Sequence, residues 1–160
     1  DIPLTADRED VEKWLDKLSS GEVKSLRRIF LYRDPAEFET YLAKKLLAFH
    51  SASISGLEAR LVAEADFLRF KQDFGIADGV DDIGIFSNSY LYLGISRKND
   101  NIAGTFSRDS VRIEKYIACF DSLWASNAAR PVTSMNLKPL SLQELFDPSA
   151  SVTKLGQQRS

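Results

Sequence analysis

The sequence predicts an α/β (α+β) fold with one mixed sheet of about five strands and helices packed on it. Three observations predict this class: apolar stripes at helical spacing, short runs rich in β-branched and aromatic residues, and turn residues between the last three of these runs. The expected order is α-β-α-β-α-β-β-β-α, followed by an irregular C-terminal tail. With 160 residues and 44% hydrophobic composition, the chain is long enough for one substantial core.

The first expected element is an amphipathic helix that begins after Asp7 as its N-cap and ends at Gly21. Its apolar positions recur at helical spacing: Val11, Trp14, Leu15 and Leu18. A strand at 29–32 follows. Asp34, Pro35 and Glu37 then have the spacing of a capping box with Pro at the first helical position. We therefore expect a second helix from residue 35 to about His50.

The middle of the chain alternates between strand and helix signals. Apolar and charged residues alternate from Leu57 to Leu61, which predicts a half-buried strand, and residues 66–74 predict a short helix. A loop rich in Gly and Asp precedes three short strands at 83–86, 90–96 and 102–107. The turn residues between these strands are typical of an antiparallel meander.

The last strong element is a helix that Asp109 caps and that ends near Asn127. We therefore expect one α/β domain with an N-terminal helix over residues 1–130. Residues 131–160 contain three prolines, and we expect a partly disordered tail there. Ser141 and Glu144 could cap one short helix in that tail, with Leu142, Leu145 and Phe146 as its apolar residues.

Composition excludes several classes of protein. The formal net charge is −2, which argues against a nucleic-acid partner and against an anionic membrane surface. No run of residues has the length and apolar character of a membrane span. The single cysteine, Cys119, forms no intrachain disulfide and lies in an apolar stripe, so we expect a core residue and a cytoplasmic protein. The chain begins at Asp1, as a fragment or a processed product would.

Candidate catalytic groups are few. His50 is the only histidine, and its expected place at a helix end suits a cation better than a catalytic base. Asp78, Asp81 and Asp82 share a loop, but their spacing matches no EF-hand, and a solvated loop explains them as well. The glycines form no dinucleotide or phosphate-binding motif. We expect no catalytic residue, no metal site and no cofactor.

One group of residues predicts a small ligand site. An arginine and hydroxyl groups at a strand end, directly before a helix N-terminus, are typical of an anion pocket, although ordinary sheet surface explains them too. The predicted ligand-binding residues are Tyr92, Ser96, Thr105, Ser107 and Arg108.

The order of elements over residues 25–127 resembles one half of the phospholipase D-like fold. The strand ending in Gly94-Ile95-Ser96 is similar to the strand of that family that carries a Gly-Ser pair. The closing helix, with Tyr116-Ile117 and the segment 120–124, is similar to helices of non-catalytic relatives. The resemblance implies a regulatory or sensory module. It also implies a homodimer, because the enzymes of the family place two halves around a twofold axis.

The chain departs from the family's catalytic motif. That motif needs a histidine, a lysine two residues on and an aspartate five residues further. An alignment on the turn at Asn88 places Asp81, Ile83 and Asn88 there, and none of the three fits. His50 is followed by Ser51 and Ala52, so it does not start the motif either. Within the resemblance, the chain is a pseudo-enzyme.

Three functions follow from these observations. The first is a non-enzymatic regulatory domain in signalling that binds a small ligand or a protein partner as a homodimer. The second is a phosphodiesterase or nuclease whose degenerate site uses His50 and the loop aspartates. The third is an accessory domain for nucleic acid, which the acidic balance opposes.

Overall fold

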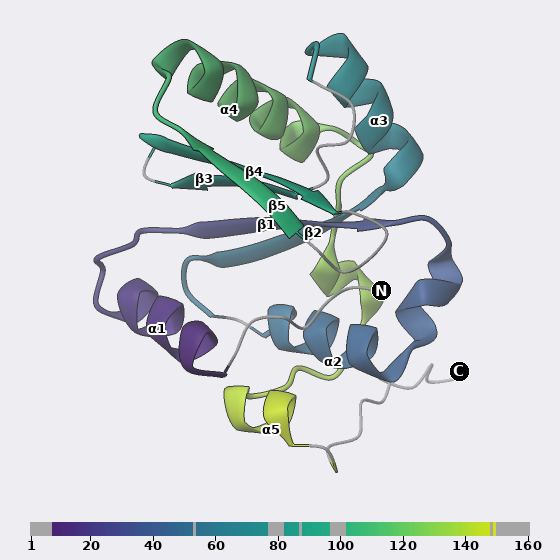
Figure 1. Cartoon of the computed structure of the whole chain (residues 1–160). Helices are drawn as coiled ribbons and strands as arrows, with labels where there is room; N and C mark the ends of the chain where they lie inside the picture. The colour runs from purple at the N-terminus through teal and green to yellow at the C-terminus, as the bar shows by residue number, and fades with distance from the viewer. Residues whose placement is uncertain are drawn as a thin grey trace. The chain divides into compact units, whose positions relative to one another are not determined.

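The computed structural model describes residues 8–52, 54–76, 82–86, 88–96, 102–147 and 149. Its contacts divide the chain into two compact units. The first unit takes residues 1–63 together with 129–160, and the second takes residues 64–128. The described residues form helices and strands in the predicted alternation, so the mixed α/β class is confirmed (Figure 1).

A parallel strand pair forms the centre of the first unit. Strand β1 (Leu26–Tyr32) pairs with β2 (Leu57–Ala63) in register from Leu26 opposite Leu57 to Tyr32 opposite Ala63. The chain crosses between them through helix α2 (Tyr41–His50), as parallel strands require. On the other edge of β2, the two-residue strand β6 (Arg130–Pro131) pairs antiparallel with Arg60 and Leu61.

The prediction of one mixed sheet of about five strands is wrong. The described strands pair into two separate sheets, β1-β2-β6 in the first unit and β3-β4-β5 in the second. The parallel pair depends on a helical crossover, whereas the meander pairs through its own short turns. The strands of each sheet therefore hydrogen-bond among themselves. The spacing of apolar residues shows that a segment is a strand, but not which sheet it joins.

The predicted helix over residues 35–50 is interrupted. Residues Pro35–Glu39 form a 3-10 turn, η1, which Asp34 and Glu37 close with the expected capping box. Thr40 then adopts an extended backbone conformation with φ −67° and ψ 144°, and its hydroxyl accepts a hydrogen bond from the Ala43 amide. Thr40 therefore ends η1 and caps α2. The sequence thus contains two N-caps six residues apart, Asp34 for η1 and Thr40 for α2.

Three α-helices and two 3-10 turns cover the sheet of the first unit. Helices α1 (Arg8–Ser19), α2 and α5 (Leu142–Phe146) lie on one side of β1 and β2 (Figure 1). The largest fully buried side chains here are Phe49, Leu47 and Leu61. The Asp7 cap predicted for α1 lies outside the described residues.

Gly56 is required at the start of β2. Its φ of +82° lies in the left-handed region, and a Cβ atom there would come within 2.8 Å of the Lys24 carbonyl oxygen. Its own carbonyl accepts a hydrogen bond of 2.6 Å from the Leu26 amide, which sets the register of β1 against β2. Any other L-residue would strain this turn.

The division of the chain does not coincide with the predicted boundary near residue 130. The segment from Ala129 continues through β6, the 3-10 turn η2 (Val132–Met135) and α5, and its contacts belong to the first unit. Its leucines pack into that core: Leu137, Leu140 and Leu145 are all buried. The prolines in this segment stop long helices but leave packing intact. Residues 148 and 150–160 of the predicted tail lie outside the described residues.

The second unit contains the predicted meander and two helices. Strands β3 (Asp82–Phe86), β4 (Tyr90–Ser96) and β5 (Ile102–Ser107) pair antiparallel, which confirms the predicted hairpins. Helix α4 (Ser110–Ala125) begins after Asp109, whose carboxylate accepts a hydrogen bond from the Arg112 amide at 3.1 Å. Helix α3 (Glu64–Asp73) begins two residues earlier than predicted.

Candidate functional site

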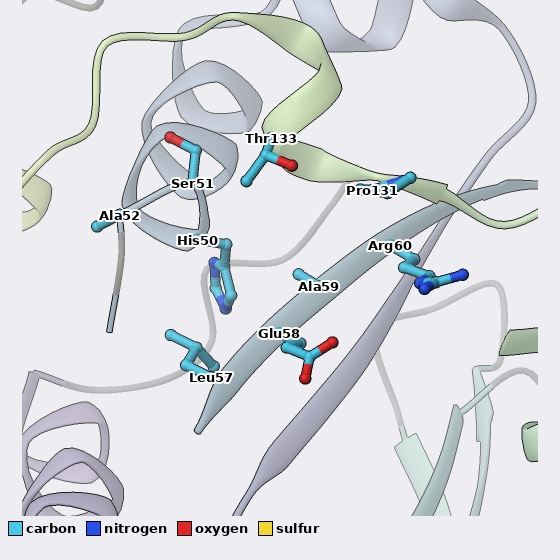
Figure 2. Close-up of a pocket in the computed structure, with 9 residues that line it drawn as sticks. All are labelled: His50, Ser51, Ala52, Leu57, Glu58, Ala59, Arg60, Pro131 and Thr133. Atoms are coloured by element: carbon cyan, nitrogen blue, oxygen red, sulfur yellow. The ribbon is translucent and has the colours of Figure 1, made fainter. Parts of the chain in front are cut away.

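A small open pocket lies in the first unit, between the end of α2, strand β2 and the segment that contains β6 and η2. Its volume is about 250 Å³, below the range of roughly 300–1,000 Å³ typical of drug-sized ligand sites. The walls come from the end of α2, the first half of β2 and the start of η2 (Figure 2). The lining residues are His50, Ser51, Ala52, Leu57, Glu58, Ala59, Arg60, Pro131 and Thr133.

His50 forms one wall and is buried, with 3% of its surface exposed. Its Nδ1 atom lies 2.8 Å from the Leu46 carbonyl oxygen, and its Nε2 atom lies 3.3 Å from Nη1 of Arg28. A carbonyl oxygen only accepts, so Nδ1 carries the proton and donates it. The guanidinium of Arg28 only donates, so Nε2 accepts. Both ring nitrogens of the chain's only histidine therefore face protein atoms.

The His50 ring is neutral at pH 7. Its pKa is lowered from 6.5 to about 4, mainly by burial and also by the positive charge of Arg28, while the hydrogen bond to the Leu46 carbonyl opposes this shift. The rings of Phe30 and Phe49 contact the imidazole edge-on, with centroids 5.0 and 5.4 Å away. The expected cation at the end of this helix is therefore absent, because the apolar surroundings outweigh the helix dipole.

Arg28 reaches His50 from the neighbouring strand. It lies opposite Ala59 in the β1–β2 register and two residues from Phe30, so all three share one face of the sheet. Its guanidinium carbon lies 5.4 Å from the centroid of the Phe30 ring. The Arg28 guanidinium is therefore held close to the end of α2 by the Phe30 ring and by the His50 imidazole.

Three segments of the chain meet the edge of β2 at the pocket. Gly56 directs its carbonyl toward β1, so by alternation Leu57, Ala59 and Leu61 direct their amide and carbonyl groups to the other edge. On that edge β6 pairs with Arg60 and Leu61 only, because η2 begins at Val132 and carries the chain away. The Leu57 amide is held by the Ile54 carbonyl. The backbone groups of Ala59 therefore point to the edge of β2 on which β6 lies, next to the residue that follows Pro131.

The structure places the side chains of three of the five predicted ligand-binding residues of the second unit. Thr105 and Ser107 lie opposite Leu93 and Leu91, the buried residues of β4, and so share their face. Arg108 stacks over the ring of Tyr90 at 4.7 Å, on the opposite face. Tyr92 and Ser96 belong to β4, but their side chains lie outside the described residues.

The helix N-terminus beside these residues is already capped. The Asp109 carboxylate accepts from the Arg112 amide, and Ser107 Oγ accepts from the Asp109 amide at 3.2 Å. The chain's own carboxylate therefore occupies the position in which an external anion would bind. The five-residue anion pocket remains a prediction.

The other candidate groups form no described catalytic cluster. Asp78 and Asp81, and the side chain of Asp82, lie outside the described residues. Cys119 is 3% exposed, and burial raises the pKa of its thiol, as expected of a core residue. Within the described part of the chain, His, Cys, Asp and Glu side chains make no group of three able to hold a metal ion.

The described helices were also compared with the requirements of a membrane span, and none is both long and apolar enough to cross a bilayer. No family model, no curated protein and no solved structure matches the chain significantly. The resemblance to the phospholipase D-like fold therefore remains a prediction.

Sequence reasoning missed most of this pocket. His50, Glu58 and Thr133 line the pocket from separate segments of the chain, and Arg28 contacts His50 from β1. Only the register of β1 and β2 and the fold-back of β6 bring these segments together. One signal was present in the sequence. Arg28 precedes an apolar run at two-residue spacing from Phe30, which places a charge on the face of that strand that packs inward.

Proposed function

We propose that this chain is a non-enzymatic regulatory domain that binds another molecule in the pocket beside β2. The observation that carries the proposal is the state of His50. The only histidine of the chain lies in the pocket wall, neutral and with both nitrogens directed at protein atoms. The pocket therefore has polar groups suited to binding and a histidine that is a poor base near pH 7.

The residues that line the pocket suit ligand binding better than catalysis. Charged residues of both signs, Glu58 and Arg60, line the pocket together with Thr133, which carries a hydroxyl group. A few polar groups placed around a small concavity are typical of a site that orients a ligand. The proposed role is a signalling or sensory one in a homodimer, as the phospholipase D-like resemblance implies, and the single cysteine favours the cytoplasm as its compartment.

The first experiment is a thermal-shift screen of the purified chain against nucleotides, metal ions, common metabolites and short peptides, with the mass followed by light scattering. A compound that binds the native state raises the melting temperature with its concentration. A hit that is lost in the Thr133→Trp variant, which fills the pocket, supports the proposal. A hit that this variant leaves unchanged assigns binding to another site and contradicts it.

A hydrolysis assay tests the enzymatic alternative directly. Bis(p-nitrophenyl) phosphate is a general phosphodiester substrate, and we expect no turnover above the buffer rate with the wild-type chain. Turnover that disappears in His50→Ala would overturn the proposal and establish the phosphodiesterase alternative. Turnover equal in both proteins would point to a contaminant or to a site without His50.

A further inference from the structure

Strand β1 forms one edge of the sheet in the first unit. The strand order is β1-β2-β6, so β1 pairs with β2 on one side, and no described strand pairs with it on the other. The Leu26 amide identifies the paired side, because it donates to the Gly56 carbonyl at the start of β2. With seven residues, β1 is long enough to pair with a further strand of ordinary length.

The outer edge of β1 presents the backbone groups of every second residue. These groups alternate in direction along a strand, and those of Leu26 point to β2. Arg27, Ile29 and Leu31 therefore direct their amide and carbonyl groups to the outer edge. Neither Ile29 nor Leu31 forms a hydrogen bond with a described group on that edge. A strand edge of this kind is a template for pairing with another chain.

The segment that carries this edge is strongly basic. Residues 24–33 contain four basic residues and no acidic residue, in a chain whose formal net charge is −2. Two of the basic residues, Arg27 and Arg28, lie on β1 itself. Glu58 lies opposite Arg27 in the register of β1 and β2, on the paired side of the strand. The charge of the outer edge therefore favours a neighbouring strand that carries acidic residues.

The same arginines select against a second copy of this chain. Pairing of β1 with β1 of another copy would bring Arg27 and Arg28 of both copies onto two neighbouring strands. Like charges on neighbouring strands are destabilising, and proteins commonly place charged residues on an edge strand to prevent such self-association. An acidic strand meets attraction at the same positions, so the edge discriminates between the two occupants by charge.

We infer that the outer edge of β1 binds an extended, acidic segment of a partner protein, which adds a strand to the sheet. The added strand is antiparallel, the slightly more stable orientation per residue, and exchanges backbone hydrogen bonds with Arg27, Ile29 and Leu31. Its residue opposite Arg27 is acidic. Its residues opposite Ile29 and Leu31 are β-branched, because these two half-buried side chains share one face of the sheet.

The test is a titration of the ¹⁵N-labelled full chain with acetyl-Thr-Val-Thr-Val-Glu-Glu-amide, followed by amide chemical shifts. In the inferred register the two valines lie opposite Leu31 and Ile29, and the last glutamate lies opposite Arg27. We expect the amides of Arg27, Ile29 and Leu31 to shift more than those of Arg28 and Phe30, since only the first three gain hydrogen bonds. A uniform shift along β1, or no shift at millimolar peptide, would overturn the inference.

Two N-methylated peptides test whether the contact is a strand pair. A methyl group on the backbone nitrogen of the second valine removes the hydrogen bond to Ile29 and should weaken binding about tenfold or more. The same group on the second threonine, whose amide points away from β1, should change binding by less than about twofold. Replacement of both glutamates by lysines should weaken binding about fivefold or more, because attraction becomes repulsion. Equal binding of the two N-methylated peptides would contradict the strand pair.

Matched variants locate the peptide on the chain. Ile29→Pro removes an amide hydrogen that points to the outer edge and leaves the hydrogen bonds between β1 and β2 in place, so the variant should fold and lose binding. Ile29→Val is its control and should bind as the wild-type chain does. Arg27→Gln should weaken binding about two- to fivefold, the range of an exposed charge pair. Full binding by folded Ile29→Pro would overturn the site, and if this variant unfolds, the two N-methylated peptides decide.

The inference does not rest on the proposed function, because β1 and β6 lie on opposite sides of β2. Thr133→Trp, which fills the pocket, should leave peptide binding unchanged. If Thr133→Trp abolishes it, the peptide occupies the pocket, so the inference fails while the proposed function stands. If Ile29→Pro abolishes peptide binding and no ligand responds to Thr133→Trp, the inference stands and the proposed function fails.

Discussion

Acid should destabilise the first unit through His50. The folded state holds this imidazole at a pKa of about 4, whereas the unfolded chain holds it near 6.5. The unfolded state therefore binds a proton more readily than the folded state between these two values. The stabilisation is fully present above pH 6.5 and is lost as the pH falls through 6.5 toward 4.

The magnitude follows from the difference between the two pKa values. A difference of about 2.5 units corresponds to about 3 kcal/mol when the pH lies below both values, and to about 2 kcal/mol at pH 5. Because the ring is buried, solvent does not screen this effect. Glu144 and Asp147 also have lowered pKa values, from hydrogen bonds to Ser141 and Ser149, but their window lies below that of His50.

The assay is urea unfolding at pH 7.5 and pH 5.0 with the wild-type chain and His50→Gln, both in a Trp124→Phe background. This background leaves Trp14, whose ring lies 6.1 Å from that of Phe49, as the reporter of the first unit. The wild-type chain should lose about 2 kcal/mol more than the variant between the two pH values. A single histidine also gives one imidazole NMR signal, which should not titrate between pH 8 and 5.5.

Two results would refute this reasoning. An equal loss of stability in the wild-type chain and in His50→Gln would mean that the imidazole is as easily protonated folded as unfolded. An NMR midpoint near 6.5 would mean that the ring reaches solvent, and the argument against His50 as a base would then fall with it.

Three further predictions concern local structure. Asp109→Ala should cost about 1 kcal/mol, because the Arg112 amide loses its cap, and thermal unfolding of the variant measures this. Lys45 is buried and donates to the Asp147 carbonyl, so Lys45→Met should speed amide exchange in α5, which mass spectrometry of the exchanged peptides detects. Cys119 should react with Ellman's reagent in urea far faster than in the native chain, since it is buried and its thiol pKa is raised; equal rates would contradict its burial.

Local signals in the sequence predicted most elements of the fold. Asp109 and the capping box of Ser141 with Glu144 both lie where expected, because a cap depends on residues three positions apart. The meander also followed from its own turns. The interruption at Thr40 was missed because the apolar residues keep helical spacing across it. The spacing of apolar residues does not show where a 3-10 turn ends and an α-helix begins.

Non-local pairing was beyond the reach of the sequence. Strand β6 has two residues, too few for any periodic pattern, yet it decides which part of the β2 edge is covered. The division into two sheets has the same origin. Strand signals show that a segment is extended, but the partner of each edge depends on how the intervening helices pack.

The candidate site illustrates this limit most directly, because it depends on where β6 ends. Strand β6 stops at Pro131, and η2 begins at Val132. A continued β6 would place Val132 opposite Ala59 and Thr133 opposite Glu58, and the pocket would be filled by the chain itself. Instead Pro131 pairs with Arg60 without needing an amide hydrogen, and Val132 begins η2 with its side chain in the core, 1% exposed. The burial of Val132 therefore opposes a longer strand, and β6 ends at Pro131 because the segment after it packs into the core.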